Sequence, residues 1–195
     1  MTPEQATEYL SGKYRTYDQR AIRYRLAAYA MILMGLDDSS SVLDIGGGDA
    51  ELEQCLREEF GWRGIYTNAD HVHGIDIFRD VLDGHLNNRH AETKKGNRWY
   101  WRHDFVTCLE VAEHFPGTSA VRLIEELPGF ARKGVVFSTP NARVQNVLDM
   151  DPTHRCGLRP GNFTRRDYTV EEHMLYEGYY SDGLVDGLIA YKEVS

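Results

Sequence analysis

The chain has 195 residues, of which 42% are hydrophobic, and a formal net charge of -8. This length is enough to bury one substantial core, and the even spread of apolar residues predicts a single domain. The negative charge argues against a protein that holds a long nucleic-acid backbone by bulk electrostatics, because such binding depends on many Lys and Arg contacts to phosphates.

The cysteines and the apolar segments of the sequence indicate the cellular compartment in which the protein occurs. The three cysteines, Cys55, Cys108 and Cys156, form no CxxC pair, which is typical of a reducing compartment. The start of the chain, MTPEQATEYL, has neither the basic nor the apolar segment of a signal peptide. The longest near-apolar run, LAAYAMILMGL, is too short to span a bilayer. We therefore expect a cytoplasmic protein without a membrane segment.

Helix and strand patterns alternate along the chain. Apolar residues at helical spacing predict a long helix within residues 17–36, which DDSSS ends. Residues 41–45, SVLDI, are typical of a short buried strand. A second helix is predicted over residues 50–60, where apolar residues recur every three or four positions. The first half of the chain therefore begins as helix, strand, glycine turn and helix.

The alternation continues toward the C-terminus. Strands are predicted at GIYTNAD, GIDIF, DFVTCLE and GVVFSTP, and a helix at SAVRLIEELPGF. The tail, DGLVDGLIAYKEV, predicts two antiparallel strands joined near Gly187. The fold class predicted from this order is α/β: a doubly wound, mostly parallel sheet with helices on both faces and a C-terminal antiparallel strand pair.

Three glycines, Gly46, Gly47 and Gly48, follow the first predicted strand. Ligands of doubly wound sheets bind outside the carboxyl ends of the strands, where glycines let the backbone approach them closely. A dinucleotide pattern fails because its third glycine position holds Glu51, and no Gly-Lys-Ser/Thr follows to make a P-loop. Asp44 favours a cationic ligand instead, and S-adenosylmethionine carries a sulfonium and an ammonium. The alternative is a glycine turn that only packs a helix against a strand.

The segment VLDIGGGDA resembles the first motif of the class I S-adenosylmethionine-dependent methyltransferases, in which an acidic residue precedes a G-x-G-x-G loop. Here Ala50 replaces the last glycine. The resemblance covers about residues 42–142 and implies a Rossmann-like fold with S-adenosylmethionine as the cofactor. It implies that the cofactor is bound by Asp44, Gly46, Gly47 and Gly48. We also expect a β-branched side chain at Gly46 to enter the cofactor's space.

Later strand ends also match this family. The resemblance implies that Asp70 accepts hydrogen bonds from the ribose hydroxyls, with Asp76 as a competitor for this role, and that Asp80 lies near the adenine amino group. It also implies that Leu109 and Glu110, at the end of DFVTCLE, line the cofactor site.

The EVAEH segment carries a possible metal site. Glu110, Glu113 and His114 stand at i, i+3 and i+4, so a helix after VTCL would project all three from one face. EVAEH and the later STPN, residues 138–141, resemble segments of ubiquinone-pathway O-methyltransferases. In small-RNA 3′-end 2′-O-methyltransferases the same Glu, Glu and His bind a metal with a later histidine, for which DPTHR offers His154.

Two interpretations of this segment are open. In one, Glu110, Glu113, His114 and His154 bind Mg²⁺ or Mn²⁺. In the other, which we favour on the sequence, Glu110 lines the cofactor pocket while Glu113 and His114 form hydrogen bonds within the helix. Without a metal ion, His114 or His154 is a candidate general base, because the unperturbed pKa of histidine is near neutrality.

We predict a methyltransferase of the transferase class that acts on oxygen of a small or medium-sized acceptor. The alternatives are a metal-dependent RNA 2′-O-methyltransferase, which the net charge disfavours, and a non-catalytic S-adenosylmethionine-binding protein. We divide the single domain, residues 1–195, into an N-terminal helical lid at 1–36, a cofactor-binding core at 41–142 and a substrate-side region at 143–195.

Overall fold

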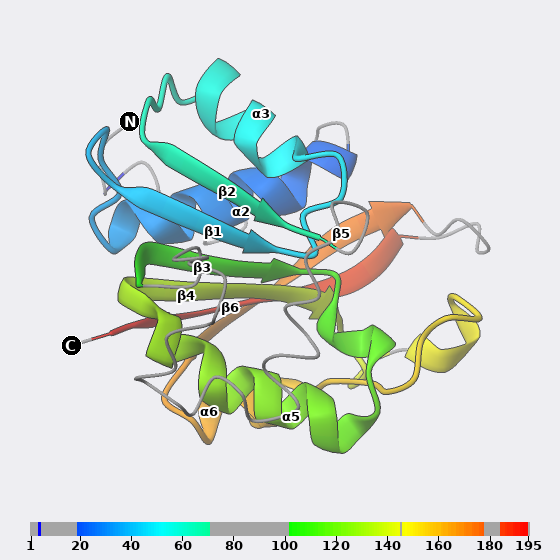
Figure 1. Ribbon diagram of the computed structural model, residues 1–195. Helices are drawn as coiled ribbons and strands as arrows, with labels where there is room; N and C mark the ends of the chain where they lie inside the picture. The colour runs from blue at the N-terminus through cyan, green and yellow to red at the C-terminus, as the bar shows by residue number, and fades with distance from the viewer. Residues whose placement is uncertain (1–3, 5–18, 71–101, 145, 178–183, 195) are drawn as a thin grey trace.

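A six-stranded sheet, with strand order β2-β1-β3-β4-β6-β5, forms the centre of the protein (Figure 1). The computed structural model describes residue 4 and residues 19–70, 102–144, 146–177 and 184–194. The strands are β1 (Ser41–Ile45), β2 (Ile65–Ala69), β3 (His103–Leu109), β4 (Ala131–Pro140), β5 (Thr169–Glu177) and β6 (Leu184–Glu193). Strands β2, β1, β3 and β4 are parallel, and β6 and β5 are antiparallel to their neighbours. The predicted fold class is confirmed.

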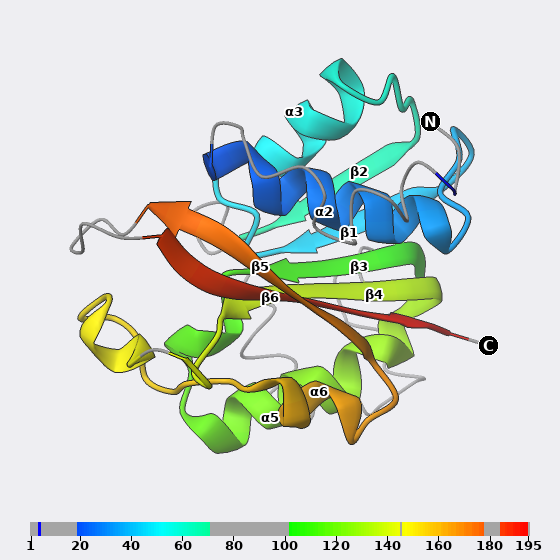
Figure 2. The ribbon, with the colours of Figure 1, turned by 180° about the vertical axis from the view of Figure 1, so that it is seen from behind.

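Helices cover both faces of this sheet. The α-helices are α2 (Gln19–Leu33), α3 (Glu51–Glu58), α5 (Gly117–Glu126) and α6 (Pro160–Thr164). Short 3-10 helices are η4 (Ala112–His114), η5 (Leu127–Phe130) and η6 (Val147–Asp149). Helices α2 and α3 lie on one side and α5 and α6 on the other, in both views of the ribbon (Figures 1 and 2).

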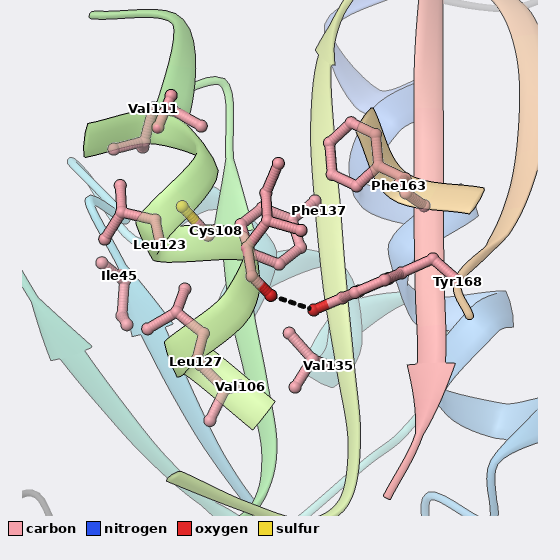
Figure 3. Packing of buried hydrophobic residues seen from close by; sticks show 14 of the residues in the cluster. Ile45, Val106, Cys108, Val111, Leu123, Leu127, Val135, Phe137, Phe163 and Tyr168 are labelled. Atoms are coloured by element: carbon pink, nitrogen blue, oxygen red, sulfur yellow. Dashed lines mark hydrogen bonds between the residues drawn. The ribbon is translucent and has the colours of Figure 1, made fainter. Parts of the chain in front are cut away.

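Two hydrophobic clusters hold these layers together. Adjacent strand residues point to opposite faces, so Val42 packs with α2 and α3 while Leu43 packs with α5 and its neighbours. On the α5 side, the rings of Phe137, Phe163 and Tyr168 lie 5.7 to 5.8 Å apart between centroids (Figure 3). The Tyr168 hydroxyl donates a hydrogen bond of 2.9 Å to the Ile124 carbonyl, which ties the residue before β5 to α5. Burial on both faces explains why the three inner parallel strands β1, β3 and β4 contain nearly continuous apolar runs.

The predicted N-terminal helix is part of a layer of the fold. Residues Leu26 to Met31 of α2 are buried, and the helix contacts α3, β4 and β5. Figure 2 shows α2 crossing the sheet face on the side of α3. Arg23 and Tyr24, near the start of this helix, line the cavity at the strand ends that is described below.

The tail does not form the predicted hairpin. It is a single strand, β6, and Gly187 lies in its middle, paired with Pro140 of β4 on one side and His173 of β5 on the other. We took Gly187 as a turn, but a glycine is also tolerated inside a strand where other backbones approach closely. The antiparallel partner is β5, which the sequence analysis did not predict. The predicted strand at GIDIF lies outside the described residues.

Candidate active site

The parallel strands all end at one edge of the sheet (Figure 1). A cavity of about 270 Å³ is lined by the turn after β1 and by the end of β3. We call it the glycine-loop cavity. The predicted residues that line it are Asp44, Gly46, Gly47, Gly48, Leu109 and Glu110. The structure therefore gathers six of the eight predicted cofactor-site residues around one space.

The backbone of the turn needs glycine for three different reasons. Gly46 and Gly48 have positive φ angles of 73° and 48°, which L side chains rarely adopt. A Cβ on Gly47 would lie 2.5 Å from Oδ2 of Asp44. A Cβ on Gly46 would lie 2.4 Å from a methyl of Val111. Our expectation for Gly46 was therefore wrong in its reason: a side chain there collides with the protein before it reaches any ligand.

Asp44 is held in place by two hydroxyl groups. Its side chain is buried, Oδ1 accepts a hydrogen bond of 2.6 Å from Thr107, and Oδ2 accepts one of 2.5 Å from Tyr66. Burial raises the pKa of Asp44, and the two donated hydrogen bonds oppose that shift. A cation in the cavity would favour the charged carboxylate in the same way.

Sequence analysis missed Thr107 and Tyr66, although one signal was present. Thr107 is the polar residue within the apolar run FVTCL, and parallel register places it directly beside Asp44. Tyr66 belongs to β2, the other neighbour of β1. A polar residue inside a buried strand needs a hydrogen-bond partner, so Thr107 could have been paired with a strand-end carboxylate in advance.

The start of α2 and the start of α3 close one side of the cavity. Arg23, Tyr24, Asp49 and Glu51 line it in addition to the predicted residues. The Tyr24 hydroxyl donates a hydrogen bond of 2.5 Å to Glu51, and Arg23 donates one of 2.9 Å to the same hydroxyl. Within the described part of the chain, Arg23 is the one basic side chain in this lining. Helical periodicity could place these residues on helices but not against one another.

Asp70 lies beside the loop without lining the cavity. It is buried, and its Oδ2 accepts a hydrogen bond of 3.0 Å from the backbone N–H of Gly48. Asn68 donates to the Gly48 carbonyl at 2.8 Å, so the end of β2 fixes the loop from both sides. The other predicted positions, Asp80 and its alternative Asp76, lie outside the described residues.

A second group of polar side chains lies just beyond β3. Potential ligand atoms of Glu113, His114 and His154 all lie within 4.8 Å of one another, and the two imidazole centroids are 4.9 Å apart. We call this set the Glu113 cluster. Backbone N–H groups of Arg155 and Cys156 donate to the Glu113 carbonyl at 2.8 and 3.1 Å. These two hydrogen bonds bring the segment of His154 to η4, a pairing that sequence could suggest only by resemblance.

Glu113 differs from the two histidines of this cluster in its side-chain hydrogen bonds. Its side chain is fully buried, and neither carboxylate oxygen has a hydrogen-bond partner among the residues that the structure describes. Burial and the nearby charge of Glu110 raise its pKa well above the usual range. The hydrogen bonds that we expected Glu113 to form within a helix are therefore absent from the described residues, and that interpretation was wrong for this residue.

Glu110 occupies a different place from the other three predicted ligands. It has a positive φ of 57° and precedes η4, so the predicted single helical face does not form. Its carboxylate accepts a hydrogen bond of 2.7 Å from Ser138 and lines the glycine-loop cavity. A left-handed non-glycine residue costs about 1–2 kcal/mol, which the surrounding contacts must offset. Glu110 thus lies between the cavity and the Glu113 cluster, and its charge acts on Glu113.

The family of the chain follows from comparison with known proteins. The model of a methyltransferase domain family matches residues 13–175, which is most of the chain. The chain belongs to this methyltransferase family. This result confirms the predicted class, the class I S-adenosylmethionine-dependent methyltransferases, and its six-stranded mixed sheet is the fold of that class. No curated protein sequence matches the chain.

Solved structures of methyltransferases have the same fold at low sequence identity. The small RNA methyltransferase HEN1 is 17% identical, with a TM-score of 0.55, and the match covers 94% of this chain but 27% of that one. The magnesium protoporphyrin IX methyltransferase ChlM from Synechocystis, solved with bound SAH, is 14% identical with a TM-score of 0.54. That match covers 98% of this chain and 94% of ChlM. A SAM-dependent methyltransferase from Archaeoglobus fulgidus is 16% identical, with a TM-score of 0.52 and coverages of 90% and 95%.

These likenesses establish the fold and leave the acceptor undetermined, because the matched enzymes differ in the substrates that their names print. Among the residues that the structure describes, no helix combines the length and apolar character that a membrane span requires.

Proposed function

We propose that residues 1–195 form one methyltransferase domain that transfers the methyl group of S-adenosylmethionine to an oxygen of a small or medium-sized acceptor. The observation that carries the proposal is the glycine-loop cavity, in which a buried, doubly hydrogen-bonded Asp44 borders a turn without side chains. A carboxylate placed there suits a ligand with positive charge, and a bare backbone suits its close approach.

The charges of the cavity lining support a specific orientation of the cofactor. Asp44 would attract the ammonium and sulfonium end of S-adenosylmethionine. Arg23, the basic residue near the start of α2, would pair with its carboxylate. Asp70, whose carboxylate lies at the glycine loop, would accept hydrogen bonds from the ribose hydroxyls. Asp80 remains the candidate for the adenine amino group, and Leu109 and Glu110 the candidates for the floor of the site.

The Glu113 cluster would serve the acceptor. Methyl transfer requires in-line placement of the nucleophile against the sulfonium methyl, and removal of the acceptor proton. Where no metal ion is bound, His114 or His154 would take that proton. Burial lowers the pKa of His114, which favours the neutral imidazole that a base requires. Glu110 adjoins both regions, so an acceptor oxygen beside the cluster would face the cofactor site.

The small acceptor is inferred from two segments. EVAEH and STPN resemble the ubiquinone-pathway O-methyltransferases, and the two are linked in this structure by the hydrogen bond from Ser138 to Glu110. The net charge of -8 also favours a small molecule over a long polyanion.

A divalent cation fits the cluster chemically. A fully buried carboxylate without hydrogen-bond partners among the described residues is costly unless it is protonated or neutralised, and two imidazoles lie within reach of it. Glu113, His114 and His154 would hold Mn²⁺ or Mg²⁺, with Glu110 beside them. Such an ion would lower the pKa of an acceptor hydroxyl and orient it.

A second candidate function follows from the same cluster. Glu113, His114 and His154 lie close together, as the resemblance to small-RNA 2′-O-methyltransferases implies for a metal site. This arrangement favours an RNA 3′ end as the acceptor. The acidic net charge counts against it.

A methyl-transfer assay tests both candidates. Labelled S-adenosylmethionine is offered with pools of small hydroxylated acceptors and, separately, with short RNA, each in the presence of chelator or Mn²⁺. We expect label in the small-molecule pool and more of it with Mn²⁺. Label only in RNA supports the second candidate. Calorimetric binding of S-adenosylmethionine without transfer to any pool indicates a non-catalytic binding protein, and equal affinity for NAD contradicts the cofactor assignment.

A further inference from the structure

Both histidines of the Glu113 cluster are held through the same ring nitrogen. Nδ1 of His154 lies 2.8 Å from the backbone carbonyl oxygen of Val147. A carbonyl oxygen can only accept a hydrogen bond, so Nδ1 of His154 must carry the proton. In a neutral imidazole, Nε2 is then the nitrogen with the free lone pair.

The hydrogen-bond pattern around His114 leads to the same result by one more step. Nδ1 of His114 lies 2.9 Å from the Thr153 hydroxyl, and this hydroxyl lies 2.5 Å from Oδ1 of Asp151. The Thr153 backbone N–H donates to the same carboxylate oxygen at 2.7 Å, and these hydrogen bonds lower the pKa of Asp151. An ionised carboxylate only accepts, so the single hydroxyl proton of Thr153 goes to Asp151. The hydroxyl oxygen therefore accepts from Nδ1–H of His114.

We infer that Thr153, braced by Asp151, is a positioning residue, and that together with the Val147 carbonyl it fixes both histidines in the Nδ1–H tautomer. The segment 147–153 thus fixes the tautomer of both imidazole rings. Val147, Asp151 and Thr153 themselves lie outside the Glu113 cluster. Free neutral histidine prefers the other tautomer, so the arrangement is imposed by the fold.

The consequence is that Nε2 of each ring is the nitrogen available to the cluster. This is the atom that a metal ion or an acceptor proton would need, and a second hydrogen bond that fixes the ring is the usual companion of such a role. The tautomers follow from the hydrogen bonds alone, whereas their use in binding a metal ion rests on the proposed function.

Nitrogen NMR of the imidazole rings tests the inference without any ligand. Long-range proton-nitrogen spectra of the full, metal-free chain distinguish the two neutral tautomers, with the rings assigned from His114→Asn and His154→Asn variants. Spectra are recorded over a range of pH, and where each ring gives the signals of a neutral imidazole we expect Nδ1–H in both. A spectrum with His114 or His154 in the Nε2–H form overturns the inference.

Substitution of Thr153 isolates its role. Thr153→Val removes the hydroxyl and keeps the shape, so the His114 tautomer should shift toward Nε2–H while His154 stays unchanged. Thr153→Ser keeps the hydroxyl and should keep the wild-type spectrum. Thr169→Val, at an exposed threonine of β5, is the matched control for the substitution itself. An unchanged His114 tautomer in Thr153→Val contradicts the role of Thr153.

Mn²⁺ titration connects the tautomer to the proposed function. If the cluster binds Mn²⁺, Thr153→Val should weaken binding about 10- to 100-fold, which is the usual cost of losing such a hydrogen bond. Unchanged Mn²⁺ affinity in that variant overturns the positioning role. If the wild type binds no Mn²⁺ but shows both tautomers and the Thr153→Val shift, the positioning role stands and the metal in the proposed function fails.

Discussion

The glycine-loop cavity and the Glu113 cluster each contain a buried carboxylate, and the two carboxylates differ in their hydrogen bonds. Asp44 receives a hydrogen bond on each oxygen, from Thr107 and Tyr66. Glu113 is equally buried, yet among the described residues it receives none. A buried charge that is paired is prepared for a ligand that comes and goes, whereas one that is unpaired is costly until a proton or cation neutralises it. The carboxylate of the first region has its hydrogen bonds within the described residues, and that of the second region has none there.

Removal of the charge of Asp44 should have the largest effect. Asp44→Asn keeps the side-chain shape but removes the anion that we assign to the cofactor's positive end. We expect S-adenosylhomocysteine and S-adenosylmethionine to bind about 100-fold more weakly by calorimetry, a loss of about 3 kcal/mol. Glu58→Gln makes the same charge change on the exposed part of α3 and should leave binding intact. Equal affinities for the Asp44→Asn variant and the wild type would remove Asp44 from the site.

Glu113→Gln tests the other side of the comparison through pH. Because the folded-state pKa of Glu113 is raised above its unfolded value, the folded form holds its proton more tightly. The protonated Glu113 carboxyl therefore contributes its full stability below the unfolded-state pKa. This contribution to the free energy of unfolding is lost as the pH rises through the folded-state pKa. Glu113→Gln should be about 2 kcal/mol more stable than the metal-free wild type at high pH, with the difference closing in acid.

Denaturant unfolding at several pH values, without metal, measures this difference. Glu58→Gln serves again as the control, because its exposed carboxyl should give a profile parallel to that of the wild type. If the Glu113→Gln profile is also parallel to the wild type, Glu113 has a hydrogen-bond donor in solution and the contrast between the two regions fails.

A smaller effect should come from the hydroxyls that hold Asp44. Thr107→Val removes one of the two donors without a change in shape, and we expect cofactor affinity to fall about tenfold, or about 1.4 kcal/mol. Thr139→Val offers a close control, since this threonine is also buried in a strand but does not line the glycine-loop cavity. An equal loss of affinity in both variants would show that packing, and not the hydrogen bond to Asp44, decides the result.

The smallest effect concerns the strain within the loop itself. Ala50 takes the place of the family's last glycine and has a positive φ of 60°. A left-handed L residue costs about 1–2 kcal/mol, which glycine would relieve. Glycine also gives the unfolded chain more conformational freedom, and this destabilises the folded state by about 0.4–1 kcal/mol. We therefore expect Ala50→Gly to raise the free energy of unfolding by about 0.5 kcal/mol, as measured in urea. A lower free energy of unfolding in Ala50→Gly would show that the alanine methyl makes a stabilising contact.

These two regions also differ in how far sequence could predict them. The loop residues follow one another along the chain after a recognisable strand, so Asp44 and the three glycines could be assigned from local pattern and resemblance. Thr107 and Tyr66 depend on strand register, which a buried apolar run leaves open. The Glu113 cluster depends on contacts between segments about 40 residues apart in sequence, such as the backbone hydrogen bond from Arg155 to Glu113.

The errors of prediction have equally specific causes. The expected helical face at EVAEH fails because Glu110 adopts a left-handed backbone and only a 3-10 turn follows. The expected hairpin at Gly187 fails because glycine was taken as a turn signal, whereas β4 and β5 flank it on both sides. In both cases tertiary pairing decided between local alternatives that the sequence pattern could not separate.

A crystal structure of the protein with S-adenosylhomocysteine tests the central claim most directly. We predict that the ligand occupies the glycine-loop cavity, with its amino group beside Asp44, its carboxylate at Arg23 and its ribose at Asp70, and that its sulfur faces Glu110 and the Glu113 cluster. S-adenosylhomocysteine bound away from the glycine loop, or in the cavity with its sulfur turned away from Glu110, would contradict the assignment of the two regions to cofactor and acceptor.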